Sequence, residues 1–225
     1  MNTDAHHALV AALACFALNQ VTLAQETPAG MEKLDYRMPK PMFISTQKNF
    51  GNCNLEPSRG DKPRPPIFVP QGCSNLALKK EVTSSGLNPD IGSLDLITDG
   101  DKEEGDHQYA ELSPGLQWVQ IDLGRSCEIR AIVVWHRHYD PRVYRDVIVQ
   151  IADDAKFIDG VKIVFNNDHD NSSGLGIGKD LEYIENYEGR PIAVKGVKGR
   201  YVRLYSSGNT SNQMNHYMEV EVYGK

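Results

Sequence analysis

The amino-acid sequence predicts an all-β protein, an antiparallel β-sandwich preceded by an extended, proline-rich arm. In residues 115–124, apolar side chains at 119, 121 and 123 alternate with polar ones at 120 and 122, the period of a strand with one buried face. In EIRAIVVW, residues 128–135, apolar side chains occupy both faces, so this strand should lie deep in a sheet. No stretch after residue 75 has a convincing helical period.

The composition is ordinary for a globular protein, with 40% hydrophobic and 24% charged residues in a chain of 225. The net charge of -6 argues against nucleic acid as a partner, because that binding depends on phosphate neutralisation by clustered Lys and Arg. After the leader, no apolar run approaches the roughly 20 residues that span a bilayer. We therefore expect no nucleic acid partner and no transmembrane segment.

Residues 1–24 have the pattern of a signal peptide. Residues 8–18 are apolar apart from Cys15, and Thr22-Leu23-Ala24 follows at the position that a signal peptidase reads. We expect the mature chain to be exported, as a secreted, extracellular or periplasmic protein.

Removal of the leader leaves three cysteines, Cys53, Cys73 and Cys127. In an oxidising compartment an odd number predicts one disulfide and one free thiol. We expect the disulfide to join Cys53 to Cys73, closing a loop of about 20 residues at a gain of roughly 3 kcal/mol in the loop-entropy estimate. Cys127, at the start of a strand, is expected to be a small buried apolar residue.

After the leader, the chain divides into an arm and a β-sandwich. Prolines recur through residues 25–74, which lack sustained periodicity and are expected to form an extended arm whose last third is docked. The sandwich should occupy residues 75–225. Its expected strands, besides the two above, lie within residues 75–85, 145–154, 161–168, 199–208 and 218–224.

The order of these pieces resembles the discoidin domains, also called coagulation factor 5/8 type C domains. The pieces are NLAL and VTSS, LITDG, LQWVQIDLG, EIRAIVVW, RDVIVQIADD, GRYVRLY and MEVEVYG, covering about residues 75–224. The resemblance implies the galactose-binding-like jelly roll, which many carbohydrate-binding modules and the fucose-binding F-type lectins share.

The resemblance also implies a structural calcium site that joins the two ends of the fold. It assigns side-chain ligands to Asp99 and Glu219, and carbonyl ligands to Leu96, Asp101 and Met218. Calcium takes six to eight oxygens from carboxylates and carbonyls, which suits an acidic turn facing a glutamate on a strand. A further ligand is expected within residues 106–110.

A ligand-binding loop is expected in WHRHYDPRVYR, residues 135–145, where the chain leaves a strand at one end of the sandwich. Its polar groups can exchange hydrogen bonds with sugar hydroxyls, and its tyrosines could stack on a pyranose. The candidate ligand-binding residues are Arg137, His138, Tyr139, Asp140, Arg142, Tyr144 and Arg145.

F-type lectins carry Arg-x-Asp, four residues, and then Arg or Lys at this place. Asp140 and Arg145 have that spacing, but His138 occupies the position of the first arginine and Arg137 is one residue out. His107 is the nearest match to the upstream histidine of the lectins. These departures favour a general sugar site over a fucose-specific one.

A metal-dependent hydrolase is a competing reading of the same loop. His136, His138 and Asp140 form H-x-H-x-D, and alternate strand positions would place both histidines on one face. A catalytic zinc site needs three protein ligands and an open position, and the remaining histidines, His107, His169 and His216, belong to no supporting motif.

The polar loop at residues 166–180 contains three aspartates among small residues. It lacks the order of an EF-hand loop, so a long ordered connection is expected in preference to a second cation site.

The sequence therefore predicts a non-catalytic, exported carbohydrate-binding module with a glycan or glycoconjugate as its partner. The alternative is a protein-interaction or adhesion module that binds a cell-surface protein, since discoidin-type domains also bind proteins. Binding that a free monosaccharide competes away favours the first reading, and binding that survives excess sugar favours the second.

Overall fold

The computed structural model describes residues 27–41, 50–51, 53–60, 62–86, 88–103, 105 and 107–225. The predicted signal peptide lies outside them. Within the described residues no helix is long and apolar enough to cross a membrane. The regular elements there are β1 (Met31–Lys33), β2 (Phe68–Pro70), β3 (Ser74–Asn75), β4 (Glu81–Ser84), η1 (Leu94–Thr98), β5 (Ala110–Leu112), β6 (Gln117–His136), β7 (Ile148–Ala152), β8 (Lys162–Asn166), β9 (Arg190–Ser206) and β10 (Asn215–Gly224).

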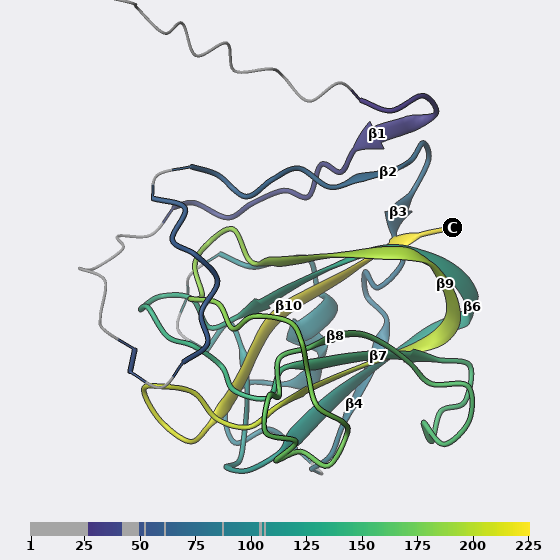
Figure 1. The fold of residues 1–225 in the computed structure, drawn as a ribbon. Coiled ribbons are helices and arrows are strands. Elements are labelled where there is room, and N and C mark those ends of the chain that lie inside the picture. The colour runs from purple at the N-terminus through teal and green to yellow at the C-terminus, as the bar shows by residue number, and fades with distance from the viewer. Residues whose placement is uncertain are drawn as a thin grey trace, which may run out of the picture.

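The main sheet has eight strands and folds over on itself. Its order is β3-β10-β6-β9-β7-β8, with β4 added to β6 and β5 to β10. β6 and β9 run through both layers, because residues 117–122 lie opposite 201–206 and residues 129–134 lie opposite 190–197. Figure 1 shows these two strands sweeping round one edge. The predicted all-β antiparallel sandwich is confirmed.

The two strands expected at residues 115–124 and 128–135 are one strand, β6, with a bend at residues 124–126. β6 continues through it, and its pairing with β9 loses register between Asp122 and Cys127. Gly124 has φ +83, a left-handed conformation that glycine adopts without a side-chain clash. A second register shift, between Ile129 and Ala131, places Ile129 on the same face as Ile132.

The main core lies between the two layers. Val119, Ile121, Ile132 and Val134 of β6 are fully buried there, in one cluster with apolar residues of β7, β9 and β10. Cys127 is also buried in this cluster, as predicted.

The N-terminal arm covers the outer face of β6 and β10. Trp135 and Met218 are fully buried there, in a second cluster with Leu34 of the arm and Val69 of β2. The ring of Tyr36 meets that of Trp135 edge to face, with 5.8 Å between centroids. β1 pairs antiparallel with β2, and Figure 1 shows β2 between β1 and the main sheet. The arm therefore explains why β6 is apolar on both faces.

The predicted disulfide between Cys53 and Cys73 is wrong, because both thiols are free. Burial raises the pKa of each, but their charged neighbours differ: Cys53 lies near Glu182, and Cys73 lies near Lys225. The two cysteines are therefore fixed in different parts of the fold. The short distance between the two cysteines in the sequence does not reveal that they lie apart in the fold.

Gly189→Ala is expected to destabilise the fold by about 2–4 kcal/mol, from left-handed strain and overpacking together. Gly189 has φ +65, and an added Cβ would lie 2.6 Å from Cε2 of Trp135. Gly160 is the matched control, since it also has φ +65 but nothing lies within 4 Å of its added Cβ. Urea unfolding should give about 1–2 kcal/mol for Gly160→Ala. Equal losses in the two variants would contradict the tight contact at Trp135.

Candidate functional site

The candidate site lies at the end of the sandwich where β6 stops at His136. Residues 137–147 form a loop there, between β6 and β7 (Figure 1). The amide of Glu185 donates a hydrogen bond of 2.9 Å to the carbonyl of Arg142, which ties this loop to the connection between β8 and β9. The loop is thus held by backbone contacts, and its side chains are displayed on a rigid support.

Asp140 joins two arginines into what we name the Arg–Asp cluster, Arg137, Asp140 and Arg142. Arg142 Nη2 donates to both carboxylate oxygens, at 2.6 and 2.8 Å, and Arg137 Nη1 donates to Oδ1 at 3.2 Å. The side chain of Arg142 is 3% exposed, whereas those of Arg137 and Asp140 are 28% and 37% exposed. The cluster therefore has a buried anchor and a solvent-facing half.

Two tyrosines flank the exposed arginine. The guanidinium of Arg137 lies 5.7 Å from the ring centre of Tyr109 and 5.2 Å from that of Tyr139. His138 is buried, and its Nε2 lies 3.2 Å from the carbonyl oxygen of Lys102. Of the predicted ligand-binding residues, the structure brings Arg137, Tyr139, Asp140 and Arg142 together at one surface, and His138 supports it from below.

Tyr144 and Arg145 lie apart from this surface. Tyr144 is buried, with its ring stacked on His136 at 4.3 Å and its hydroxyl donating to His216 Nδ1 at 2.8 Å. The prediction that Tyr144 stacks on a sugar is therefore wrong, because the ring is part of the core. Arg145 is exposed, and its backbone pairs with Gly208; its contact with a ligand stays a prediction.

The hydrolase reading is wrong for this loop. His136 is fully buried, and its Nδ1 donates to Oε1 of the buried Glu185 at 2.6 Å. Among the described residues, no group of side chains close enough to hold a metal includes His136, His138 or Asp140. His136 is the last residue of β6 and lies in the core, so the H-x-H-x-D spacing does not indicate a metal site here.

His216 is a neutral group beneath the cluster. Burial, reinforced by the positive charges of Arg142 and Arg137, lowers its pKa to about 3. The neutral ring accepts the hydrogen bond from Tyr144 and donates from Nε2 to Glu111 at 2.9 Å. The charge at this end of the sandwich therefore comes from the arginines and carboxylates at neutral pH.

The structure places the turn at Asp99 and Gly100 beside Glu219, as the predicted calcium site requires. The amide of Gly100, next to Asp99, donates to Glu219 Oε2 at 3.1 Å. Glu219 is fully buried, and its Oε1 has no hydrogen-bond partner in the described part of the chain. Burial raises the pKa of Glu219 to about 9, and the nearby carboxylates of Glu221 and Asp99 add to the effect.

This donor set fits a calcium ion. A buried carboxylate with an unused oxygen, next to a second carboxylate, is unfavourable in its ionised form unless a cation or a proton neutralises it. Calcium prefers oxygen donors of this kind. The carbonyl ligands at Leu96, Asp101 and Met218 and the further ligand within residues 106–110 stay predictions.

The loop at 166–180 is ordered by its own hydrogen bonds. Asp168 is fully buried and accepts from the amides of Ser172, at 3.1 Å, and Ser173, at 2.9 Å. Its carboxylate lies within 4.8 Å of those of Asp146 and Asp170. Burial, with the charges of Asp168 and Asp170, raises the pKa of Asp146. Sequence reasoning missed Asp146, which lies outside the loop and belongs to no motif.

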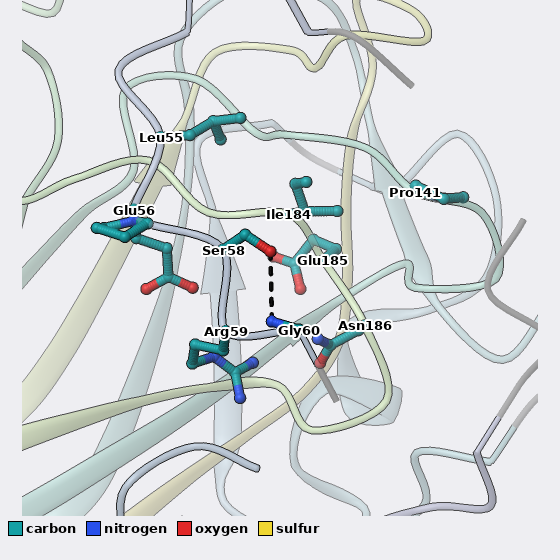
Figure 2. Close-up of a pocket in the computed structure, with 10 residues that line it drawn as sticks. Leu55, Glu56, Ser58, Arg59, Gly60, Pro141, Ile184, Glu185 and Asn186 are labelled. Carbon is teal, nitrogen blue, oxygen red and sulfur yellow. Dashed lines mark hydrogen bonds between the residues drawn. The ribbon is translucent and has the colours of Figure 1, made fainter. Parts of the chain in front are cut away.

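A cavity of about 430 Å³ lies beside the Arg–Asp cluster. Residues 55–60 of the arm form one wall, and residues 184–186 and Pro141 form the other (Figure 2). Sequence reasoning missed this cavity, because its two walls come from segments that are distant in the sequence and that only the fold brings together.

Neither a family model nor a curated protein matches the chain. Solved structures do. A family 89 glycoside hydrolase from Clostridium perfringens, in complex with 2-acetamido-1,2-dideoxynojirmycin, is 20% identical, with a TM-score of 0.50 over 67% of this chain and 14% of that chain. A fucose binding module from Streptococcus pneumoniae is 22% identical, with a TM-score of 0.47 over 68% of this chain and 98% of that chain.

A chitosan-binding module from a chitosanase/glucanase of Paenibacillus sp. IK-5 is 19% identical, with a TM-score of 0.46 over 67% of this chain and 99% of that chain. At these identities the likeness concerns the fold. The part of the hydrolase that matches is a small fraction of its length. The chain has the galactose-binding-like β-sandwich fold of the discoidin-type domains.

Proposed function

We propose that this chain is an exported, non-catalytic carbohydrate-binding module that holds a glycan at the Arg–Asp cluster. The observation that carries the proposal is the geometry of that cluster. Asp140 holds two guanidinium groups, and Arg137 lies between Tyr109 and Tyr139 at a solvent-facing end of the fold. The likeness to carbohydrate-binding modules is consistent with this function but adds only the fold.

The chemistry of the cluster suits sugar hydroxyls. Guanidinium N–H groups donate in a fixed planar fork, carboxylate oxygens accept, and a tyrosine ring offers an apolar face. Because Asp140 already orients both arginines, little side-chain freedom is lost when a ligand binds. The cluster is therefore preorganised for a polar ligand that both donates and accepts hydrogen bonds.

Calcium belongs to this proposal as a structural ion. Asp99 and Glu219 would supply carboxylate oxygens, and the ion would neutralise the buried charge of Glu219. The loop at 99–103 lies under the binding surface, since the carbonyl of Lys102 meets His138. The ion would therefore steady the loop that supports the Arg–Asp cluster.

Arg137→Ala is expected to weaken binding of the best glycan found on an array by about 10-fold, which matches the loss of one charge-assisted hydrogen bond. Asp140 and Arg142 remain paired in this variant, so the melting temperature should change little. Arg125→Ala removes an exposed arginine at the bend of β6 and serves as the control. Isothermal titration calorimetry gives both affinities.

Two outcomes would count against the proposal. The first is an unchanged affinity for Arg137→Ala. The second is a ligand that proves to be a protein whose binding survives a large excess of the free monosaccharide, which would favour the adhesion reading.

A further inference from the structure

The cavity beside the Arg–Asp cluster is a joint product of the arm and the sandwich. Figure 2 shows its lining, with Leu55, Ser58 and Arg59 from the arm and Ile184 and Asn186 from the connection that precedes β9. Its volume of about 430 Å³ lies within the range of about 300–1,000 Å³ that small-molecule sites occupy. A sandwich without the arm would have no cavity here.

The arm wall is fixed by contacts with the sandwich. The amide of Glu56 donates to the carbonyl of Glu182 at 2.8 Å, and the amide of Glu182 donates to the carbonyl of Asn54 at 3.0 Å. The carboxylate of Glu56 also accepts from Arg64 at 2.8 Å and from Arg190 at 2.6 Å. These contacts hold residues 54–56 against the connection between β8 and β9, so the wall exists before any ligand arrives.

The charged groups of the lining are already paired. Glu56 is neutralised by its two arginines, and Arg59 Nη2 donates to Glu188 at 2.7 Å. A charged ligand would have to compete with these ion pairs for its own partner. The cavity therefore favours a neutral ligand.

Several polar groups of the lining remain available to a ligand. Ser58 Oγ accepts a hydrogen bond of 3.3 Å from the amide of Gly60, which leaves its hydroxyl hydrogen to donate. Asn186 Oδ1 accepts from the amide of Glu188, and its amide nitrogen donates to none of the described residues. The apolar side chains of Leu55 and Ile184 lie among them. Amide, hydroxyl and apolar groups together suit a sugar ring.

One buried acceptor beside the cavity has no partner. Glu185 Oε1 binds His136, but Oε2 makes no hydrogen bond with any residue that the structure describes, and the side chain is fully shielded from solvent. A buried acceptor without a donor is costly, so such groups are usually completed by a ligand or an ordered water. The exposed part of Glu185 is its backbone, so its carboxylate lies behind the cavity wall and takes no part in the lining.

We propose that this cavity is a saccharide site that takes one neutral sugar unit, with Ser58 and Asn186 as direct contacts. The inference rests on the proposed carbohydrate-binding function and deepens it. It assigns the arm a part in ligand recognition. It also predicts that neutral sugars bind more tightly than uronic acids and than sugars with a free, protonated amine.

Ser58→Phe fills the cavity and tests the site. The probes are the methyl glycosides of galactose, N-acetylglucosamine, glucosamine and mannuronic acid, titrated into the full chain by calorimetry. We expect Ser58→Phe to weaken the best neutral glycoside at least 10-fold and Ser58→Ala about 3-fold, with the melting temperature unchanged. Ser74→Phe, at an exposed serine of β3, is the matched control and should bind as the parent does.

Amide chemical shifts give an independent readout. The neutral glycoside should shift the amide signals of Gly60 and Asn186 in the parent and leave them unmoved in Ser58→Phe. Unchanged affinity in Ser58→Phe, or tighter binding of the charged glycosides, would overturn the cavity assignment. If Arg137→Ala still weakens binding in that case, the proposed function stands without the cavity. Absence of glycan binding by the parent would overturn both.

Discussion

Saturating calcium is expected to raise the melting temperature by about 5–10 °C at pH 8 and by much less at pH 5. A ligand at 100 times its dissociation constant stabilises the folded state by about 2.7 kcal/mol, and a chain of this size gains about 2–4 °C for each kcal/mol. The dependence on pH comes from Glu219. Its pKa is about 9 in the folded, ion-free chain, because burial disfavours the charged form.

The sign of the pH effect follows from proton linkage. An unfolded chain releases the proton of Glu219 near pH 4.3, the ordinary glutamate value, whereas the ion-free folded chain holds it to about pH 9. Between these values the folded state binds more protons, so the ion-free protein loses stability as the pH rises. Calcium stabilises the carboxylate and removes this loss. At pH 5 the ion must compete with the bound proton, so its effect is small.

The variant Glu219→Gln distinguishes calcium binding at Glu219 from a general effect of ions on stability. The amide carries no charge, so the variant should lose the rise with calcium and the fall in stability between pH 5 and pH 8. Glu81→Gln changes an exposed glutamate of β4 and should behave as the parent does. Differential scanning calorimetry with calcium and with chelator measures both. A calcium effect that is equal at the two pH values, or that persists in Glu219→Gln, would exclude the proposed ligand.

Much of the fold could be predicted because its signals are local. The alternation of apolar and polar residues at 117–123 predicts a strand with one buried face. The apolar run at 128–135 predicts a strand buried on both faces. The continuity of β6 could not be read in the same way. Gly124 and the polar residues after it have the composition of a turn, and only the pairing of β9 with residues on both sides of them shows that the strand continues.

The site was predicted where its residues are neighbours in the chain. Arg137, Asp140 and Arg142 meet because they share one short loop. The position of Asp99 near Glu219 could be predicted only because the resemblance supplied a long-range pairing. Tyr144 was misplaced, since its burial depends on contacts with His136 and His216 on other parts of the fold. The cavity was missed for the same reason, and its arm lies outside the part of the chain that the resemblance covers.

Trp135→Ala is expected to destabilise the protein by about 3–5 kcal/mol, the range for removing a fully buried large aromatic side chain. The ring is 0% exposed, and its Nε1 donates to the carbonyl of Tyr187 at 3.0 Å. It also supports two neighbours, since Lys102 Nζ lies 4.7 Å from its centre and Tyr36 of the arm meets its edge. The melting temperature should fall by about 6–20 °C.

Trp118→Ala is the control, because that ring is half-buried on β6 and packs against Arg203 at 4.4 Å, away from the arm. Trp118→Ala should lower the free energy of unfolding by about 1 kcal/mol.

The loss of the Trp135 ring should also loosen the arm, so limited proteolysis within residues 27–41 should be faster in Trp135→Ala than in Trp118→Ala. Tyr109 and Tyr139 pack against the same buried cluster as Trp135, so glycan affinity should fall with it. Equal stability and equal proteolysis in the two variants would mean that the arm is a loose attachment, and that the outer face of β6 needs another explanation for its apolar side chains.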